Sequence, residues 1–342
     1  MGKEIAILLY SKTPSGGLKV LFRIGNGLLQ RGHQVKFYIA EDEGCYALEY
    51  ENACELIHSE KPIPYRLFRR LKYLMQLEIR ADIVLATYFP TAIAAYYNAK
   101  IEGQLFYYVQ ANETHFFSFR IKTLIRRFHY FLLAHLSYKL PISKVINCFG
   151  SSLGLPKAQY TEVPPGIDPS IYYPRARSNK RLKIGHISRQ EIRKGSEEFF
   201  TAMKNLRAQG FEFDLLIAYN KCTHTQGLEF EVQMPKNENE LAAFYASCDI
   251  VLSTVWEKGF AYPPLETMAC GSLSIATPID YGTPSVDFVP IEINNAKGIE
   301  EAIKWVIHHP EEAEKIRLNG INLSQHYHWD KIIDKWERLF LC

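Results

Sequence analysis

Short, nearly continuous apolar runs alternate with longer amphipathic segments along the whole chain. The runs IAILLY, DIVLAT, DIVLST and LSIAT hold few polar positions, as expected of strands that are covered on both faces. Strands are predicted at 4–10, 34–40, 82–87, 104–109, 160–163, 182–188, 212–218, 228–232, 249–253 and 273–277. Helical spacing predicts helices at 17–31, 64–79, 91–100, 115–135, 196–209, 238–247, 264–270, 298–308, 311–325 and 328–340. This alternation predicts an α/β protein with parallel sheets and right-handed crossovers.

A proline-rich segment divides this pattern into two halves. The stretch VPPGIDPSIYYPRARSNKR (163–181) contains four prolines and ends in a basic, polar tail, after which a new strand is predicted. Each half has the length of one doubly wound domain. We therefore expect two Rossmann-like domains facing a cleft, over 1–168 and 169–327. Residues 328–342 form a terminal amphipathic helix, which needs a further surface to cover its apolar face.

The composition is that of an ordinary globular protein. Of the 342 residues 47% are hydrophobic and 23% are charged, and a formal net charge of +3 is too small to indicate a nucleic-acid partner. The seven cysteines are odd in number and include no Cys-x-x-Cys, so neither a disulfide framework nor a zinc site is expected, and a cytoplasmic location is predicted. No apolar stretch reaches membrane-spanning length.

Positive charge is concentrated in the first half. Residues 60–144 hold 13 Lys and Arg against five Asp and Glu, mostly in the helical patterns 65–77 and 119–136. Basic amphipathic helices of this kind can lie on an anionic membrane surface. They can equally be half-buried domain helices with solvated basic faces, and the sequence leaves both interpretations open.

Three segments carry candidate ligand chemistry. Gly16 and Gly17 lie between a strand and a helix, where glycine permits a close ligand approach or simply a tight turn, although Gly-x-Gly-x-x-Gly is absent. The segment IGHISRQEIRKGSEEFF (184–200) places Arg189 and Lys194 after a strand and before a helix, which favours a phosphate or diphosphate site over a solvated basic loop.

The third segment is EKGFAYPPLE (257–266), with a glutamate at each end. A helix is expected to start at about Pro264, because proline suits the first helical turn, and Glu266 is then expected in that turn. Glu257 lies in the loop before it. In the plainest interpretation Glu266 stabilises the helix N-terminus and Glu257 is a solvated loop residue.

Taken together, these segments resemble retaining glycosyltransferases of the GT-B fold, in the family called glycosyltransferase family four. The matching pieces are SGG with LLQRGHQV, then VPPGID, ISRQEIRKG and EKGFAYPPLETMACG, in that order over nearly the whole chain. The last resembles the Glu-x7-Glu signature of the family, although Glu257 and Glu266 are one position too far apart, and Lys258 is either an insertion or has taken the place of the first glutamate. The YPPLE and VQANE pieces are similar to a rhamnosyltransferase subset.

The resemblance implies a donor site in the second domain. Arg189 and Lys194 would hold the diphosphate of a nucleotide sugar, and Glu266 would bind the ribose hydroxyls. Glu257 would hold hydroxyls of the donor sugar. The backbone of Gly259, Phe260 and Ala261 would meet the sugar and its phosphate.

The resemblance also implies roles for the first domain and the terminal helix. Gly16 and Gly17 would approach the donor phosphate, and the terminal helix would cross back to this domain. Glu113 and His115 follow the strand at 104–109. Glu113 is a candidate for binding the acceptor, and His115 could bond the acceptor or a donor-sugar hydroxyl or be an ordinary loop histidine. No Asp-x-Asp motif occurs, so no metal and no cofactor are expected.

The sequence therefore predicts a retaining glycosyltransferase. Its partners would be a nucleotide-sugar donor and a glycan or polyprenyl-linked acceptor, in cell-surface polysaccharide or glycoconjugate synthesis at the inner face of the membrane. Two alternatives stay open: an inactive nucleotide-sugar-binding protein of the same fold, favoured by the irregular glutamate spacing, and a GT-B nucleotide-sugar epimerase. The sequence does not specify the sugar, the base or the acceptor.

Overall fold

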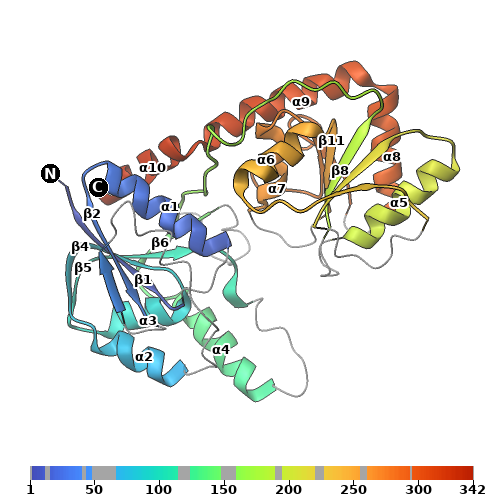
Figure 1. Cartoon of the computed structure of the whole chain (residues 1–342). Coiled ribbons are helices and arrows are strands. Elements are labelled where there is room, and N and C mark those ends of the chain that lie inside the picture. The colour runs from blue at the N-terminus through green and yellow to red at the C-terminus, as the bar shows by residue number, and fades with distance from the viewer. Residues whose placement is uncertain are drawn as a thin grey trace. The chain divides into compact units, whose positions relative to one another are not determined.

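The structure is a computed structural model that describes residues 2–11, 16–40, 44–47, 67–114, 124–147, 159–188, 195–219, 227–254, 260–292 and 295–341. The chain forms two compact units. Unit 1 comprises Met1–Pro165 together with Trp329–Cys342, and unit 2 comprises Gly166–His328. Figure 1 shows a sheet flanked by helices in each unit.

The unit 1 sheet has the strand order β3-β2-β1-β4-β5-β6-β7. Its strands are β1 (Glu4–Leu9), β2 (Gln34–Ile39), β3 (Gly44–Ala47), β4 (Ile79–Ala86), β5 (Ile101–Val109), β6 (Ser143–Ile146) and β7 (Tyr160–Glu162). All neighbours pair in parallel except β2 and β3, which are antiparallel. The apolar runs fill the central strands, where residues 5–9 of β1 are all buried.

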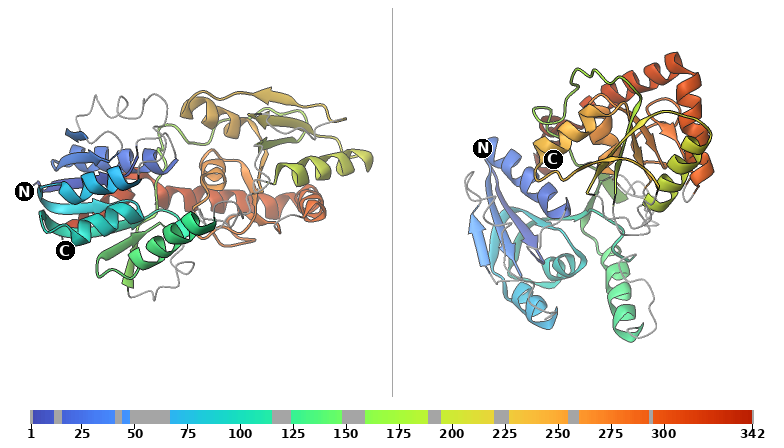
Figure 2. Two further views of the ribbon diagram at one scale, coloured as in Figure 1. Left: turned by 90° about the horizontal axis from the view of Figure 1, so that it is seen from below. Right: turned by 45° about the vertical axis from the view of Figure 1, so that its right-hand side comes forward.

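Helices cover both faces of this sheet. They are α1 (Gly16–Gln30), α2 (Leu67–Gln76), α3 (Phe89–Tyr97), α4 (Leu124–Ser137) and α10 (Trp329–Leu341). α1 packs on α10, whereas α3 packs between α2 and α4, and the two groups lie on opposite faces (Figures 1 and 2). In β5, Tyr107 belongs to the core beneath α2 and α3, while Tyr108 faces the other way. Among the helices that the structure describes, none is long and apolar enough to cross a membrane.

The terminal helix α10 covers the remaining face of unit 1, so the predicted crossing back to the N-terminal domain is confirmed. Trp336 meets Tyr108 edge-on at 5.0 Å between ring centroids, and both side chains are buried. Gly27 of α1 gives room to Ile333, whose side chain lies 2.4 Å from the position a Cβ would take. Arg31 bonds Glu337 at 2.7 Å and so fixes the helix at its rim.

The unit 2 sheet is wholly parallel, with the order β10-β9-β8-β11-β12-β13. Its strands are β8 (Lys183–Ile187), β9 (Asp214–Ala218), β10 (Glu231–Gln233), β11 (Ile250–Ser253), β12 (Leu273–Ala276) and β13 (Val289–Pro290). Its helices are α5 (Ser196–Ala208), α6 (Glu238–Ser247), α7 (Tyr262–Ala269), α8 (Ala296–His308), α9 (Pro310–Ser324) and the 3-10 turn η7 (Gln325–Tyr327). Separate cores form on its two faces, one with α5 and α8 and the other with α6 and α7.

The predicted fold class, two parallel-sheet α/β domains, is confirmed. The predicted helices and strands all have counterparts among the described elements, but β3, β6 and β13 were not predicted. α7 begins at Tyr262 and not at Pro264, so both prolines occupy early positions where a missing N–H costs nothing. Glu266 is consequently the fifth helical residue, and the expectation that it lies in the first turn is wrong.

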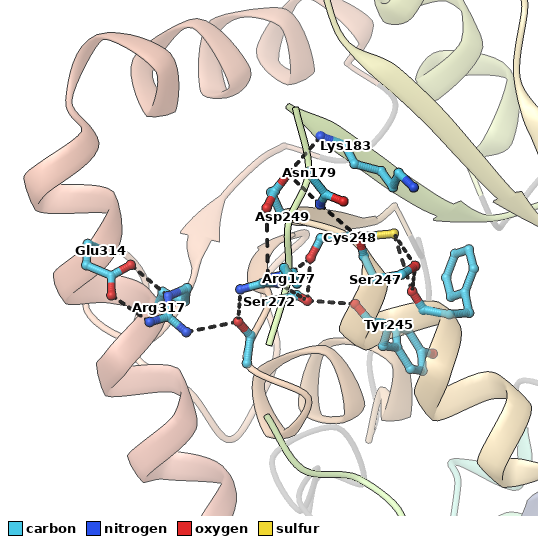
Figure 3. Close-up of polar contacts among 12 residues, drawn as sticks. Arg177, Asn179, Lys183, Tyr245, Ser247, Cys248, Asp249, Ser272, Glu314 and Arg317 are labelled. Atoms are coloured by element: carbon cyan, nitrogen blue, oxygen red, sulfur yellow. Dashed lines mark hydrogen bonds and ion pairs between the residues drawn. The ribbon is translucent and has the colours of Figure 1, made fainter. Parts of the chain in front are cut away.

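Arg177 attaches the proline-rich segment to the amino edge of the unit 2 sheet. Its guanidinium donates to the carbonyl of Cys248, and to the Ser272 hydroxyl at 2.8 Å (Figure 3). The Ser272 Oγ in turn lies 2.7 Å from the carbonyl oxygens of both Tyr245 and Cys248, which share its single O–H donor. These carbonyls belong to the C-terminal end of α6, so Arg177 supplies donors that the helix itself cannot provide.

Replacing Arg177 with alanine should therefore destabilise unit 2. Several buried carbonyls would lose a charged donor, which costs about 2–3 kcal/mol of unfolding free energy. The measurement is the urea midpoint followed by circular dichroism. Arg181→Ala is the matched control, since its side chain is 61% exposed and its nearest carboxylate is 3.9 Å away. Equal midpoints for the two variants would contradict the role given to Arg177.

Candidate donor and acceptor edges

The unit 2 sheet has one point where the direction of strand addition reverses. From β8 the chain continues to β9 on one side, and from β11 it continues to β12 on the other. In open parallel sheets ligands bind at the carboxyl ends of the strands at such a switch point. The loops that leave this point are 188–195 and 254–261, which contain most of the predicted donor-site residues.

Gly195 brings these two loops together. It has φ = +64°, and a Cβ on it would lie 2.4 Å from the carbonyl oxygen of Thr254. The start of α5 is therefore packed directly on the end of β11. In the sequence, residues 189–194 precede this contact and residues 255–259 follow it. Arg189, Lys194, Glu257 and Gly259 themselves lie outside the described residues.

His186 stabilises this contact through hydrogen bonds to both α5 and β11. Its Nε2 lies 3.0 Å from the Ser196 hydroxyl and its Nδ1 lies 3.1 Å from the carbonyl oxygen of Leu252. Burial lowers the pKa of His186 to about 4, so the ring is neutral at pH 7. Nδ1–H then donates to Leu252, and Nε2 accepts from Ser196. The N-cap of α5 is Gly195, and the Ser196 hydroxyl joins α5 to β8.

An aromatic cluster holds the segment before α7. The ring of Phe260 lies 4.7 Å from that of Tyr281 and 5.2 Å from that of Tyr262. The Tyr281 hydroxyl donates to the carbonyl of Ala261, whose backbone is extended at φ = −91°. The Phe260 side chain thus packs within unit 2, and a ligand role for Phe260 and Ala261 falls to their main chain.

Tyrosine hydroxyls hold the Glu266 carboxylate. Only 9% of the residue is exposed, and its Oε2 accepts a 2.7 Å hydrogen bond from the Tyr245 hydroxyl. Burial, with the Glu266 carboxylate next in importance, raises the pKa of both Tyr245 and Tyr172. Both phenols therefore stay protonated and can act as donors. A carboxylate held in this way has a fixed orientation, which suits it to binding a pair of hydroxyls.

In unit 1 the corresponding switch point lies between β1 and β4. The Thr87 hydroxyl, just after β4, donates to the carbonyl of Leu8 at 2.7 Å and ties the two strand ends together. Gly16 opens α1, and a Cβ there would meet no atom within 4 Å. A Cβ on Gly17 would lie 2.8 Å from Oε1 of Gln110, so close packing explains that glycine without a ligand.

Glu113 lies inside unit 1 rather than on its surface. It is 3% exposed, accepts from the backbone N–H of Phe89 at 2.8 Å and from the Tyr107 hydroxyl at 2.9 Å. Burial raises its pKa to about 8. Glu113 thus fixes the start of α3 beside the carboxyl end of β5. His115 lies outside the described residues.

The sequence analysis missed the residues that build these edges: His186, Ser196, Thr254, Tyr245 and Gln110. A signal existed for His186, since it is a polar residue inside the apolar strand KIGHI, and buried polar side chains need partners. A further polar side chain lies at the same strand end. The Ser188 hydroxyl is fully buried and makes no hydrogen bond with the part of the chain that is described.

Outside these two edges, the structure has a further groove, but it contains no predicted ligand residue. A groove of about 720 Å³ is lined by Arg181, Lys183, Arg207, Phe211 and Asp214 among others, and it lies at the amino ends of β8 and β9. None of the predicted ligand residues lines it. Within the described ranges no group of three His, Cys, Asp or Glu side chains could hold a metal ion.

Comparison with known proteins identifies the region that contains the unit 2 edge. Residues 174–323 match the family model described as glycosyl transferases group 1. No curated protein sequence matches the chain significantly.

Solved glycosyltransferases share the fold of the whole chain. Sucrose-phosphate synthase from Thermosynechococcus elongatus superposes with a TM-score of 0.78 at 14% identity, over 99% of this chain and 98% of the other. HepE from Anabaena, in complex with UDP-glucose, has a TM-score of 0.68 at 15% identity, over 99% and 100%. WaaG, a glycosyltransferase involved in lipopolysaccharide biosynthesis, has a TM-score of 0.68 at 16% identity, over 98% and 99%. These likenesses establish the GT-B architecture of the two units.

The neutral His186 predicts a specific pH dependence of stability. Its pKa is about 4 in the folded protein against an ordinary value of 6.5, so the unfolded chain binds more protons between these values. The contribution is complete above pH 6.5 and is lost as the pH falls towards 4, by on the order of 3 kcal/mol. In His186→Gln the loss of stability between pH 6.5 and 4, measured by urea unfolding, should disappear. The exposed-site control His309→Gln should retain it.

Glu113 predicts the opposite dependence in unit 1. Its pKa is about 8 when folded against an ordinary value of 4.5, so the folded chain binds more protons in this range and stability decreases as the pH rises from 4.5 to 8. Glu113→Gln keeps an acceptor for Phe89 and should remove this decrease, making the variant more stable at pH 8 by about a few kcal/mol. The exposed-site control is Glu102→Gln. A variant less stable than wild type at pH 8 would show that Glu113 is ionised and well solvated.

Proposed function

We propose that the protein is a retaining glycosyltransferase that moves a sugar from a nucleoside-diphosphate donor to a glycan or polyprenyl-linked acceptor. One observation carries the proposal. Residues 174–323, which match the group 1 model, include both segments that leave the unit 2 switch point. Gly195, at the end of one segment, packs against Thr254, at the start of the other. In open parallel sheets, ligands bind at the carboxyl ends of the strands at such a switch point, so we assign the donor site to it.

The similar structures support the donor and the cellular role. HepE is described in complex with UDP-glucose, and WaaG and the galactosyltransferase WaaB are described as enzymes of lipopolysaccharide. A nucleotide-sugar donor and a role in cell-surface polysaccharide or glycoconjugate synthesis follow by analogy. We place the protein in the cytoplasm, at the inner face of the membrane. Within the family, we assign it to the rhamnosyltransferase-like subset.

The donor diphosphate is assigned to loop 189–194 and the start of α5. Negative charge grows on the diphosphate as the bond to the sugar breaks, and fixed cations beside it stabilise that change. Glu197 and Glu198 occupy the first turn of α5 and offset its positive end, so the helix alone is a poor anion site. Arg189 and Lys194 must therefore supply the charge, and a metal ion is not required for this role.

The rest of the donor is assigned to the segment that leads into α7. Glu266, oriented by Tyr245, binds the ribose hydroxyls. The main chain of Gly259, Phe260 and Ala261 meets the sugar and its phosphate. Glu257 holds donor-sugar hydroxyls, with Lys258 accommodated as an extra loop residue.

The acceptor is assigned to unit 1, where Glu113 keeps α3 in place and His115 bonds the acceptor or a donor-sugar hydroxyl, whereas Gly16 and Gly17 are assigned to the donor phosphate. The acceptor hydroxyl forms a bond to the anomeric carbon on the face from which the diphosphate departs. The bond between that carbon and the phosphate oxygen breaks, and the hydroxyl proton passes to the leaving diphosphate. No protein nucleophile is needed, so Glu257 and Glu266 are ligands and not the acid–base pair of a glycosidase.

Thermal shift with UDP-, GDP- and dTDP-sugars tests the donor assignment. Wild type should be stabilised by one class, because a ligand that binds only the folded state raises the unfolding temperature. Lys194→Ala should abolish the shift, whereas Lys315→Ala on the exposed side of α9 should leave it unchanged. A full shift in Lys194→Ala would place the diphosphate elsewhere.

Turnover then separates the competing functions. Acceptor-dependent release of nucleoside diphosphate, with the sugar attached to the acceptor in its original anomeric configuration, is the expected result. Binding without turnover across donors and acceptors would identify an inactive sugar-nucleotide-binding protein. Acceptor-independent release of an altered free sugar would identify an epimerase.

A further inference from the structure

Two tyrosines lie at the switch point of unit 1. Tyr10 directly follows β1, and Tyr88 is the second residue after β4, the strands on either side of that point. Their ring centroids are 5.6 Å apart, and the ring planes are inclined to each other by 54°. Both residues are partly exposed. Ligands of open parallel sheets bind at the carboxyl ends of the strands beside the switch point, so the two rings lie where a ligand of unit 1 is expected.

Arg70 of α2 adds positive charge to this pair. Its guanidinium carbon lies over the Tyr10 ring at 4.8 Å from the centroid, and its Nη1 donates a long 3.4 Å hydrogen bond to the Tyr10 carbonyl. A guanidinium that stacks on an aromatic ring keeps its charge and its planar fork of donors, which matches the geometry of carboxylate and phosphate. α2 contains three Lys and Arg and no Asp or Glu. We call Tyr10, Tyr88 and Arg70 the tyrosine–arginine cluster.

The buried acid at this edge does not cancel the charge of Arg70. Glu113 accepts from the backbone N–H of Phe89, the residue that follows Tyr88, and it is almost fully buried. Burial raises the pKa of Glu113 to about 8, so its carboxyl group is mostly protonated at pH 7. A cation beside a neutral acid favours a ligand that carries negative charge.

Hydrogen bonds fix the spacing of the two tyrosines. The hydroxyl of Thr91, which is fully buried, accepts from the N–H groups of Thr87 and Tyr88 at 3.0 Å and donates to the Tyr88 carbonyl at 2.7 Å. The Thr87 hydroxyl donates to the carbonyl of Leu8, two residues before Tyr10. A site that is already ordered loses less conformational freedom when a ligand binds, so this arrangement suits recognition.

We propose that the tyrosine–arginine cluster binds the acceptor sugar and selects acceptors that carry a carboxylate or a phosphate on that sugar. The sugar ring packs its C–H face on Tyr88. Arg70, which Tyr10 holds in place, forms paired hydrogen bonds with the anionic group. The inference rests on the proposed function, because it names the class of acceptor that the transferase uses.

Sugar binding to the full-length protein, without any nucleotide sugar, tests this inference. The probes are the neutral methyl glycoside, the uronate and the 6-phosphate of glucose, galactose and mannose, and dissociation constants come from NMR titration. Wild type should bind the uronate or the 6-phosphate of one sugar at least about tenfold more tightly than its neutral form, because a charged hydrogen-bonded pair is added. The uronate and phosphate arms identify which anionic group is recognised.

Two variants with matched controls assign the preference to the cluster. Arg70→Gln should reduce the anionic preference to about twofold or less and leave the neutral form bound as in wild type, whereas Arg70→Lys should keep part of the preference. Arg80→Gln, at a side chain that is 87% exposed, is the control and should keep all of it. Urea midpoints equal to that of wild type show that these variants are folded.

Tyr88→Leu separates ring packing from charge. It should weaken the neutral and anionic forms alike, by about threefold or more, because each loses the same aromatic surface. Tyr97→Leu, at a residue that is 63% exposed at the end of α3, should bind as wild type does. No anionic preference in wild type, an equal preference in Arg70→Gln, or unchanged binding by Tyr88→Leu would each overturn the inference.

The failure of this inference is distinguishable from the failure of the proposed function. Donor binding is measured separately, by thermal shift with nucleotide sugars. A donor shift without any anionic preference rejects the acceptor class alone. No shift with any donor rejects the transferase, whatever the sugar titrations give.

Discussion

The close approach of Gly195 to Thr254 is the constraint on which the unit 2 edge depends. Any side chain at residue 195 would collide with the Thr254 carbonyl, and the backbone there is left-handed. The contact makes the end of β11 the support for the start of α5, and it fixes the residue that follows segment 189–194 and the residue that precedes segment 255–259. His186 reinforces it by joining Ser196 of α5 to Leu252 of β11. Without this contact the end of segment 189–194 and the start of segment 255–259 would not be held together.

In each unit, one titratable side chain is buried near the carboxyl end of a strand and is uncharged at neutral pH. Burial holds His186 neutral in unit 2 and Glu113 protonated in unit 1, each against its ordinary pKa. In each case the group joins a strand end to a helix N-terminus, so it positions the edge and carries no charge towards a ligand. The charge that a nucleoside diphosphate requires must then come from the loops themselves, which is why Arg189 and Lys194 are central to the proposed function.

The sequence predicted the fold well because its signals are local and repeated. Apolar runs such as residues 5–9 can only be buried parallel strands when helices alternate with them, and the terminal helix had too apolar a face to remain uncovered. The strand β6 was missed because Lys144 interrupts it, and the structure shows its ammonium group donating to the carbonyls of Leu140 and Ile142. The supporting contacts were beyond sequence reasoning. Tyr245 and Glu266, or His186 and Leu252, are brought together only by the order of the strands.

The most direct test of the central claim is hydrogen–deuterium exchange with and without UDP, GDP or dTDP at saturating concentration. Binding at the switch point predicts protection of peptides that cover 184–200 and 252–269, including the start of α5 and the segment before α7. Peptides of the groove at the amino ends of β8 and β9, around 207–215 and 229–231, should not change. Protection confined to that groove, or no protection with any of the three nucleotides, would contradict the account.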